Sequence, residues 1–346
     1  IMGNGVRKTH DALRTVIPEL VTNEIPTGTR CFDWVIPDEW NLEDAYIADM
    51  SGRRVIDVKD NNLHVMSYSA PVDTILARDE LMTKVFSLPD MPDAIPFVTS
   101  YFDDRWAFCI TERQRQGLTD DRYHVVIEAT LKPGSMTYGE ILVPGESVIA
   151  GFVLTCVGDD HNWSFLPARH ADTLPERAAR HVLEKVLKVP YRSFTYANRG
   201  SDERQYCAPG VGLPVVSIMR SKYGTYPEYH TSLDDLTVVS PTGLWGGYQA
   251  NRLAIDVIEQ NETLVSTVVC EPWLSPRGLR APLRDGKYLD NFSRNVSHLM
   301  AYSDGTMDLL TIADVVGVSF FDLLPVAAIL KEQSLLRPVE ESMTSL

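Results

Sequence analysis

Two apolar segments follow one another closely, at residues 140–143 and 148–157, with only Pro-Gly-Glu-Ser at 144–147 between them. Each predicts a β-strand, and the second is nearly all apolar, which is typical of a strand buried on both faces. Parallel neighbours need a crossover of about a dozen residues, whereas Pro-Gly suits the turn of an antiparallel hairpin. The spacing therefore leaves two interpretations. Either the strands form a hairpin, or connecting chain is missing between Ser147 and Val148.

Downstream of this junction, helix patterns and strand patterns alternate. Residues 174–187 and 244–258 show the apolar periodicity of helices, and Pro175 and Pro241 lie near their starts, where proline is tolerated. The apolar run at 211–219 predicts a strand between the two helices. This alternation predicts an α/β layer built around a central sheet.

The first third of the chain has a different pattern. Residues 5–20 place apolar side chains at spacings of three and four, which predicts an amphipathic helix. From residue 31 to about 126, short alternating runs rich in aromatic and β-branched residues predict a small β-rich domain. The runs lie at residues 32–36, 63–68, 97–101 and 106–110, with turn-forming residues between them.

The C-terminal segment has the pattern of a helix-turn-helix. Residues 308–319 and 320–330 predict two helices joined by a turn that contains Gly317. Lys331 is the one basic residue of the second helix, and acidic residues surround it, so this unit would be repelled by a phosphate backbone. We therefore expect packing or homodimerisation, and not DNA binding, as its use.

Charge, hydropathy and cysteine content narrow the class of protein. A chain of 346 residues with a mean hydropathy of -0.11 is globular and long enough for about two or three domains. The net charge of -15 disfavours nucleic acid as a partner. No apolar run reaches the roughly 18 to 20 residues that cross a bilayer, so no membrane partner is expected. The five cysteines form no C-x-x-C pair, which fits a reducing cytoplasm.

His230 lies in the strongest local signal for chemistry. The segment 226–236 contains it together with Tyr229, Asp234 and Asp235, between a predicted buried strand and a predicted helix. Loops at the ends of sheet strands collect functional side chains in α/β enzymes. Two interpretations stay open: a metal ligand, or a loop histidine hydrogen-bonded by a neighbouring aspartate.

Asp159 and Asp160 come directly after a predicted strand. This placement suits carboxylate metal ligands, but an ordinary Gly-Asp-Asp turn explains it as well. No G-x-G-x-x-G, P-loop, H-E-x-x-H or G-x-S-x-G motif is present in the sequence. The sequence therefore gives no support for a nucleotide cofactor or a serine hydrolase.

Another polar cluster, at residues 200–206, precedes an apolar strand. It contains Asp202, Glu203 and Arg204. It is either a functional loop or a solvated loop in which the arginine pairs with a neighbouring carboxylate.

Four longer segments carry a family resemblance. They are DNNLHV at 60–65, PFVTSY at 96–101, DERQYCAPG at 202–210 and YGTYPEYHTS at 223–232. Together they are similar to the DUF4910 family of bacterial aminopeptidase-like proteins, which are related to the M28 zinc peptidases. The resemblance extends over essentially the whole chain. It implies an α/β fold with an M28-like phosphorylase/hydrolase-type mixed sheet and helices, an inserted small β-rich DUF2172 domain and a C-terminal winged helix-turn-helix.

The resemblance also divides the chain. The implied parts are 1–35 and 126–272 for the peptidase-like domain, 36–125 for the inserted β-rich domain and 273–346 for the winged-helix domain. Relatives carry an additional segment between Ser147 and Val148, with a ligand histidine and a glutamate base. The short linker is then explained by missing chain, and the expected catalytic base lies in the absent segment.

The same resemblance implies roles for the candidate site residues. His230 corresponds to a ligand of a single zinc ion, and Asp159 or Asp160 lies beside the position of a ligand aspartate, although Thr155 aligns with it most directly. The implied substrate-binding residues are Asp202, Glu203, Arg204 and Tyr229, with the two carboxylates placed to receive a substrate ammonium.

The resulting prediction is a zinc-dependent amide or peptide-bond hydrolase of aminopeptidase type, acting on a small peptide or aminoacyl amide. Zinc would activate a water, and a carboxylate would take its proton. Two alternatives are an amidase or deacylase acting on an amino sugar or natural-product intermediate, and a non-catalytic scaffold. If the segment after Ser147 is truly deleted, His230 has too few partners to hold catalytic zinc, which takes three protein ligands besides the reacting water.

Overall fold

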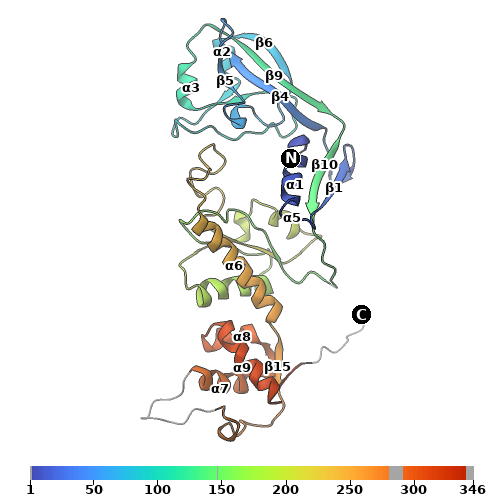
Figure 1. Cartoon of the computed structure of the whole chain (residues 1–346), viewed down its shortest axis with the longest axis vertical. Coiled ribbons are helices and arrows are strands. Elements are labelled where there is room, and N and C mark those ends of the chain that lie inside the picture. Colours follow the sequence, from blue (N-terminus) through green and yellow to red (C-terminus); the bar gives the residue numbers. More distant parts are fainter. Residues whose placement is uncertain (1, 146, 280–290, 340–346) are drawn as a thin grey trace. The chain divides into compact units, whose positions relative to one another are not determined.

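The computed structural model describes residues 2–145, 147–279 and 291–339. It divides into two compact units, which we call the first unit (Ile1–Glu146 and Pro227–Thr237) and the second unit (Ser147–Tyr226 and Val238–Leu346). Figure 1 shows the elements of each unit along the chain. Within the part of the chain that the structure describes, no helix is both long and apolar enough to span a membrane.

The first unit is built around a four-stranded antiparallel sheet in the order β5-β4-β9-β6. Tyr123, Val125 and Ile127 alternate along β9 and are buried in the core of this sheet. The β-rich character is confirmed, but its strands lie elsewhere than predicted: within the runs at 32–36, 63–68, 97–101 and 106–110, only residues 34–35 and 108–109 form named strands. The elements are β4 (Glu39–Ala48), β5 (Arg54–Asp57), β6 (Val72–Ala77), α2 (Arg78–Met82), α3 (Glu112–Gly117) and β9 (Arg122–Lys132).

Helix α1 (Asn4–Arg14) packs against the ribbon of β1 (Val21–Pro26) and β10 (Ser135–Glu140). The prediction that this helix continues to residue 20 is wrong. Pro18 lacks a backbone N–H and disfavours helical geometry in the residue before it, so the helix ends first.

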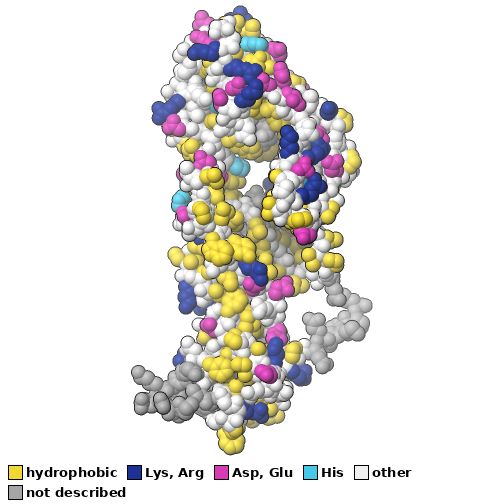
Figure 2. All heavy atoms as spheres, in the orientation of Figure 1, with side chains coloured by type: hydrophobic (Ala, Val, Ile, Leu, Met, Phe, Trp, Pro, Cys, Tyr) yellow, Lys and Arg dark blue, Asp and Glu magenta, His cyan; other side chains and the backbone are white. Residues whose placement is uncertain are grey.

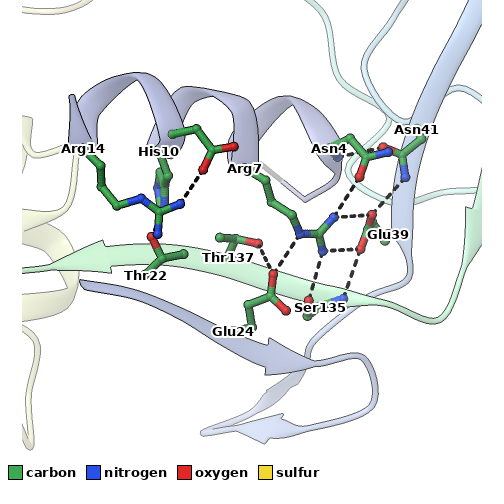
Figure 3. A network of polar contacts seen from close by, with 11 residues as sticks. Asn4, Arg7, His10, Arg14, Thr22, Glu24, Glu39, Asn41, Ser135 and Thr137 are labelled. Atoms are coloured by element: carbon green, nitrogen blue, oxygen red, sulfur yellow. Dashed lines mark hydrogen bonds and ion pairs between the residues drawn. The ribbon is translucent and has the colours of Figure 1, made fainter. Parts of the chain in front are cut away.

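Arg7 ties α1 to three strands of the first unit, β1, β4 and β10, as Figure 3 shows. Its guanidinium donates to both carboxylate oxygens of Glu39 on β4, at 2.8 and 2.7 Å. It also donates to Glu24 on β1 at 2.8 Å and to the Ser135 hydroxyl at 3.1 Å. Because Glu39 is buried, this bidentate pair fixes the helix on the sheet.

The second unit contains a mixed four-stranded sheet in the order β11-β14-β12-β13. Strand β11 is parallel to β14, which is antiparallel to β12, and all residues of β14 are buried. Strands and helices alternate along the chain, which confirms the predicted α/β layer. The elements are β11 (Gly151–Phe152), β12 (Ser164–Leu166), α4 (Leu174–His181), a π-helical turn (Val182–Val186), β13 (Arg192–Ser193), α5 (Glu203–Tyr206), β14 (Val215–Met219) and α6 (Pro241–Gln260).

The hairpin interpretation of the junction near Ser147 is wrong. Strand β10 pairs with β1 in the first unit, and β11 pairs in parallel with β14 in the second. The long apolar run after Val148 forms only the short strand β11, which lies at the edge of its sheet. The predicted strand at 140–143 is wrong as well, because only Glu140, the last residue of β10, lies in a strand. Strands β10 and β11 belong to different sheets.

Helix α6 packs directly on the loop that follows β11. A Cβ added to Gly243 would lie 2.0 Å from the carbonyl oxygen of Gly158, and one added to Gly247 would lie 2.4 Å from that of Val157. Neither contact is tolerable, so these two glycines let helix and loop pack backbone to backbone. The packing fixes the loop that carries Asp159 and Asp160.

The C-terminal part of the second unit has the arrangement of a winged helix-turn-helix. Helices α8 and α9 are joined by a turn in which Gly317 has a φ of 75°, as helix C-termini often require. The predicted helix-turn-helix is confirmed. The elements are β15 (Thr263–Ser266), α7 (Asn291–Tyr302), β16 (Asp304–Asp308), α8 (Leu309–Val316), α9 (Phe320–Glu332) and β17 (Leu336–Pro338).

Several short elements complete the fold. They are β2 (Arg30–Cys31), β3 (Trp34–Val35), a 3-10 turn (Asn62–His64), β7 (Val85–Phe86), β8 (Phe108–Cys109), a 3-10 turn (Tyr196–Asn198) and another (Ser275–Arg277).

Helix α4 is joined to the winged-helix region by side-chain contacts. Arg177 donates to both carboxylate oxygens of Asp308, at 3.0 and 2.7 Å. The buried His181 places Nδ1 2.6 Å from the Asp314 carboxylate, and its Nε2 accepts a hydrogen bond from the backbone N–H of Phe320 at 2.8 Å. Since Nε2 is the acceptor, Nδ1 carries the proton that is donated to Asp314.

Candidate functional site

The loop that carries His230 is fixed to the β-rich part of the first unit. The backbone N–H of Phe97 donates to the carbonyl of His230 at 2.9 Å, and the N–H of Ser232 donates to the carbonyl of Ile95 at 2.9 Å. The Ser232 hydroxyl also accepts from the N–H of Ile95 at 3.0 Å. These bonds and the bridge between Pro96 and Thr231 make a short antiparallel ladder that holds the loop.

His230 itself adopts an uncommon backbone conformation. Its φ is 59°, in the left-handed region that non-glycine residues rarely occupy. The imidazole stacks on Tyr229 with ring centroids 3.9 Å apart and meets the edge of Phe97 at 5.2 Å. Such a conformation costs about 1 kcal/mol or more and persists where the surroundings enforce it, which here is the ladder.

A pocket of about 480 Å³ opens beside His230. Every residue that lines it belongs to the first unit. The lining residues are Asn61, Asn62, Leu63, Phe97, His230, Thr231, Ser232 and Asp234. We take this pocket, the His230 pocket, as the candidate functional site.

Sequence reasoning found part of this pocket. It singled out His230 and its stacking partner Tyr229, but it assigned no function to Asn61, Asn62 or Phe97. These residues lie in two of the segments that carried the family resemblance, which was the available signal. Their approach to His230 depends on pairing across more than a hundred residues, which local patterns do not reveal.

Asp159 and Asp160 lie in the second unit, and the structure gives their carboxylates other partners. Asp159 is buried and accepts hydrogen bonds from the N–H and hydroxyl of Ser221 at 2.8 and 2.7 Å, and from the N–H of His161 at 3.1 Å. Asp160 accepts from the hydroxyl of Ser240, which caps α6, at 2.9 Å. Both aspartates thus brace the loop against neighbouring segments.

Glu203 is also in the second unit and is fully buried. One of its carboxylate oxygens accepts from the Tyr223 hydroxyl at 2.7 Å and from the N–H groups of Gly200 and Ser201 at 2.8 and 3.0 Å. Burial alone would raise the pKa of Glu203, but these hydrogen bonds outweigh it and lower the pKa. The carboxylate is therefore held as an internal anion, which argues against contact with a substrate ammonium. Asp202 and Arg204, by contrast, are exposed.

The predicted zinc site can be tested against the donor groups present. Across residues 2–145, 147–279 and 291–339, no group of three or more His, Cys, Asp or Glu side chains could hold a metal ion. The His230 pocket offers one imidazole and one carboxylate, Asp234, among its lining residues. These residues do not fit a catalytic zinc, which needs three protein ligands.

Three family models match the chain in sequence order. They are a domain of unknown function (DUF2172) at residues 39–130, a domain of unknown function (DUF4910) at 146–261 and a winged helix-turn-helix at 262–338. A relative from Clostridium acetobutylicum is 34% identical, over 92% of this chain and 88% of its own length. It is named as a candidate polysaccharide biosynthesis protein with an aminopeptidase-like domain. The chain belongs to the DUF4910 aminopeptidase-like family.

Solved structures agree with membership of this family. A candidate peptidase from Clostridium acetobutylicum has a crystal structure that matches 98% of this chain and 92% of its own, with a TM-score of 0.90 and 32% identity. The fold described above is therefore that of a DUF4910 protein. A zinc aminopeptidase from Bacillus subtilis matches with a TM-score of 0.45 at 12% identity, over 75% of this chain and 90% of its own.

The alignment with the Clostridium relative is longer than this DUF4910 chain. It spans 392 positions, against the 346 residues available here. The relative therefore has residues without a counterpart in this sequence. This difference in length agrees with the prediction that relatives carry an additional segment. That the segment lies between Ser147 and Val148 stays a prediction.

An apolar groove of about 880 Å³ lies in the second unit where β11 meets α6. Val148, Ile149 and Tyr248 on its walls are 60%, 58% and 57% exposed, and Figure 2 shows hydrophobic side chains gathered along α6. Contiguous apolar surface of this kind is unusual on a folded chain. It lies beside the free edge of β11, next to the junction at Ser147.

We expect this groove to bind an uncharged apolar dye such as Nile red. The substitutions Ile149→Ser and Tyr248→Ser together should reduce the fluorescence increase by about half, because they remove apolar area from both walls. Val269→Ser is the control, since Val269 is 93% exposed and lies outside the groove. Equal dye binding by the wild type, the double variant and Val269→Ser would show that the dye does not bind in this groove.

Proposed function

We propose that this protein is an amide- or peptide-bond hydrolase of the aminopeptidase type, with its substrate site at the His230 pocket. The supporting observation is the loop of His230, which the ladder to residues 95–97 holds in a left-handed conformation beside an open pocket. Membership of an aminopeptidase-like family supports the same reading. The substrate class is a small peptide or aminoacyl amide.

Zinc would lower the pKa of a bound water to about 7 and polarise the scissile carbonyl. The described residues do not supply the three protein ligands that such a zinc ion requires. The exposed imidazole of His230 can position a substrate by a hydrogen bond, and Tyr229 restricts its orientation by stacking.

Two alternative functions are each favoured by one observation. An amidase or deacylase acting on an amino sugar is favoured by the name of the Clostridium relative, which refers to polysaccharide biosynthesis. A non-catalytic scaffold is favoured by the lack of a three-ligand group in the described parts of the chain. A homodimer formed through the winged-helix region is compatible with each function.

The test is native mass spectrometry of the purified protein, followed by hydrolysis assays. A chain heavier than 38.8 kDa that carries zinc, and that releases arylamine from aminoacyl-arylamides, would support the hydrolase. Loss of that activity with a chelator would support metal dependence. A metal-free chain of 38.8 kDa that hydrolyses neither aminoacyl-arylamides nor N-acylated amino sugars would favour the scaffold.

The variant His230→Asn should lower kcat/KM by about tenfold, because it removes the imidazole whose hydrogen bond positions the substrate. Asparagine tolerates the left-handed conformation, so the backbone of the loop is kept. The control is His170→Ala, since His170 is an exposed histidine of the second unit. Unchanged kcat/KM in His230→Asn would remove His230 from the site.

A further inference from the structure

The His230 pocket receives half of its lining from the β-rich region. Asn61, Asn62, Leu63 and Phe97 lie within the segment matched by the DUF2172 model, whereas the remaining lining residues lie at 230–234. The β-rich region therefore contributes directly to the pocket. Whatever ligand enters it contacts side chains from both segments.

The charge of the pocket excludes some ligand classes. Among its described lining residues none is Lys or Arg, so a phosphate or carboxylate ligand would find no cationic partner. Asp234 carries the one formal charge among the same lining residues, and it is exposed. An ammonium at an exposed carboxylate gains little, because water screens the pair. An uncharged ligand fits this lining better than an ion.

The polar side chains of the lining suit hydroxyl and amide groups. Asn61 uses its carbonyl oxygen to accept from the N–H of Leu63 at 2.9 Å, which directs its amide group as a donor. Asn62 next to it is exposed and offers both a carbonyl acceptor and an amide donor. Two adjacent carboxamides can thus hydrogen-bond a ligand that carries several neutral polar groups.

The apolar part of the lining is aromatic. Phe97 is 41% exposed, and its ring stands edge-on to the imidazole of His230, at an interplanar angle of 67°. Its backbone position is fixed by the hydrogen bond to His230. An aromatic side chain beside carboxamides matches a ring that has one apolar C–H face and polar groups around its edge.

We propose that the His230 pocket binds an N-acylated amino sugar, with Phe97 against the apolar face of the ring and Asn62 hydrogen-bonded to its hydroxyl or acetamido groups. The volume of about 480 Å³ is within the usual range for small-ligand pockets. This inference rests on the proposed function for the place of the site and for the amide bond, and it replaces the small peptide or aminoacyl amide with an N-acylated amino sugar as the substrate class. It makes the β-rich region the part of the chain that selects the ligand.

Ligand-detected NMR on the full chain, in the presence of a chelator, tests the class of ligand. The probes are N-acetylglucosamine, glucosamine and alaninamide. We expect N-acetylglucosamine to bind with the lowest Kd of the three. Preferential binding of alaninamide, or no binding of N-acetylglucosamine at millimolar concentration, would overturn the proposal.

Variants test the place of binding. Phe97→Ala keeps the backbone bond to His230 and should raise the Kd for N-acetylglucosamine by about fivefold, and Asn62→Ala should raise it by a similar factor. Phe86→Ala is the matched control, because Phe86 is also 41% exposed but lies outside the pocket. A Kd that rises equally in the control, or in none of the variants, would place the sugar elsewhere and overturn the proposal.

The experiments distinguish failure of the hydrolase proposal from failure of the amino-sugar proposal. Binding is measured without metal and without turnover, so loss of hydrolase activity in every assay would leave the sugar result standing. Conversely, hydrolysis of aminoacyl-arylamides without binding of N-acetylglucosamine would keep the hydrolase and reject the amino sugar.

Discussion

Replacing Asp308 with alanine is expected to lower the free energy of unfolding by about 3 kcal/mol. Asp308 caps α8 by accepting from the N–H of Thr311 at 2.8 Å, and it also accepts from Asn261 at 2.9 Å and from both Arg177 amino groups. Burial would raise the pKa of this carboxyl, but these bonds hold it well below the usual range. The alanine variant loses the cap and leaves the half-buried Arg177 without its partner.

Chemical denaturation of three variants separates these contributions. Asp308→Asn keeps one acceptor at the cap but loses the charge and the second carboxylate oxygen, which accepts from Arg177 and Asn261, so about half of the effect should remain. Asp304→Ala removes an exposed aspartate of the same strand, whose contacts are with nearby Thr306, and should cost about 0.5 kcal/mol or less. Similar losses in Asp304→Ala and Asp308→Ala would contradict a special role for Asp308.

Replacing Arg7 with alanine is expected to cost about 2 kcal/mol, because it leaves the buried Glu39 carboxylate without its bidentate partner. The hydrogen bonds from Arg7 are the largest influence on Glu39 and lower its pKa from 4.5 to about 2. The matched control is Arg14→Ala on the same helix, since Arg14 pairs only with the exposed Asp11 among its described contacts. Thermal or denaturant unfolding gives the difference between the two variants.

The same pair predicts a pH dependence. A carboxyl with a lowered folded-state pKa contributes stability above its unfolded-state pKa and loses it as the pH falls through the folded-state value. For Glu39 the contribution should therefore be complete above about pH 4.5 and should fade toward pH 2. The stability difference between wild type and Arg7→Ala should shrink over that window. A difference that stays constant from pH 6 to pH 2 would assign it to another interaction.

Local patterns predicted the second unit better than the first. The helices α4, α6, α8 and α9 were found from their apolar periodicity and from Pro175, Pro241 and Gly317 near their ends. Strands β4 and β6 are not predicted from the sequence, because charged and polar residues interrupt their apolar alternation. What stabilises them is pairing with β9, which is distant in sequence.

The candidate site, too, could be predicted only in part, because pairing between distant segments is not visible in the sequence. The position of His230 in a loop was visible in the sequence, as was the unusual density of polar residues around it. That residues 95–97 pair with this loop could not be predicted, because the register between distant segments depends on tertiary packing. Likewise, the burial of Glu203 follows from Tyr223 and the backbone of Gly200, which fold around its carboxylate.

The contacts of α4 with α8 and α9 bear on how this family can evolve. One continuous core includes Val182 and Ala254 from the segment matched as DUF4910, and Leu310 and Leu323 from the winged-helix segment. A module that shares its core with a neighbour cannot be exchanged by recombination without exposing apolar surface on both sides. Within this lineage the winged helix is therefore expected to be inherited together with the peptidase-like fold, as part of the same folding unit.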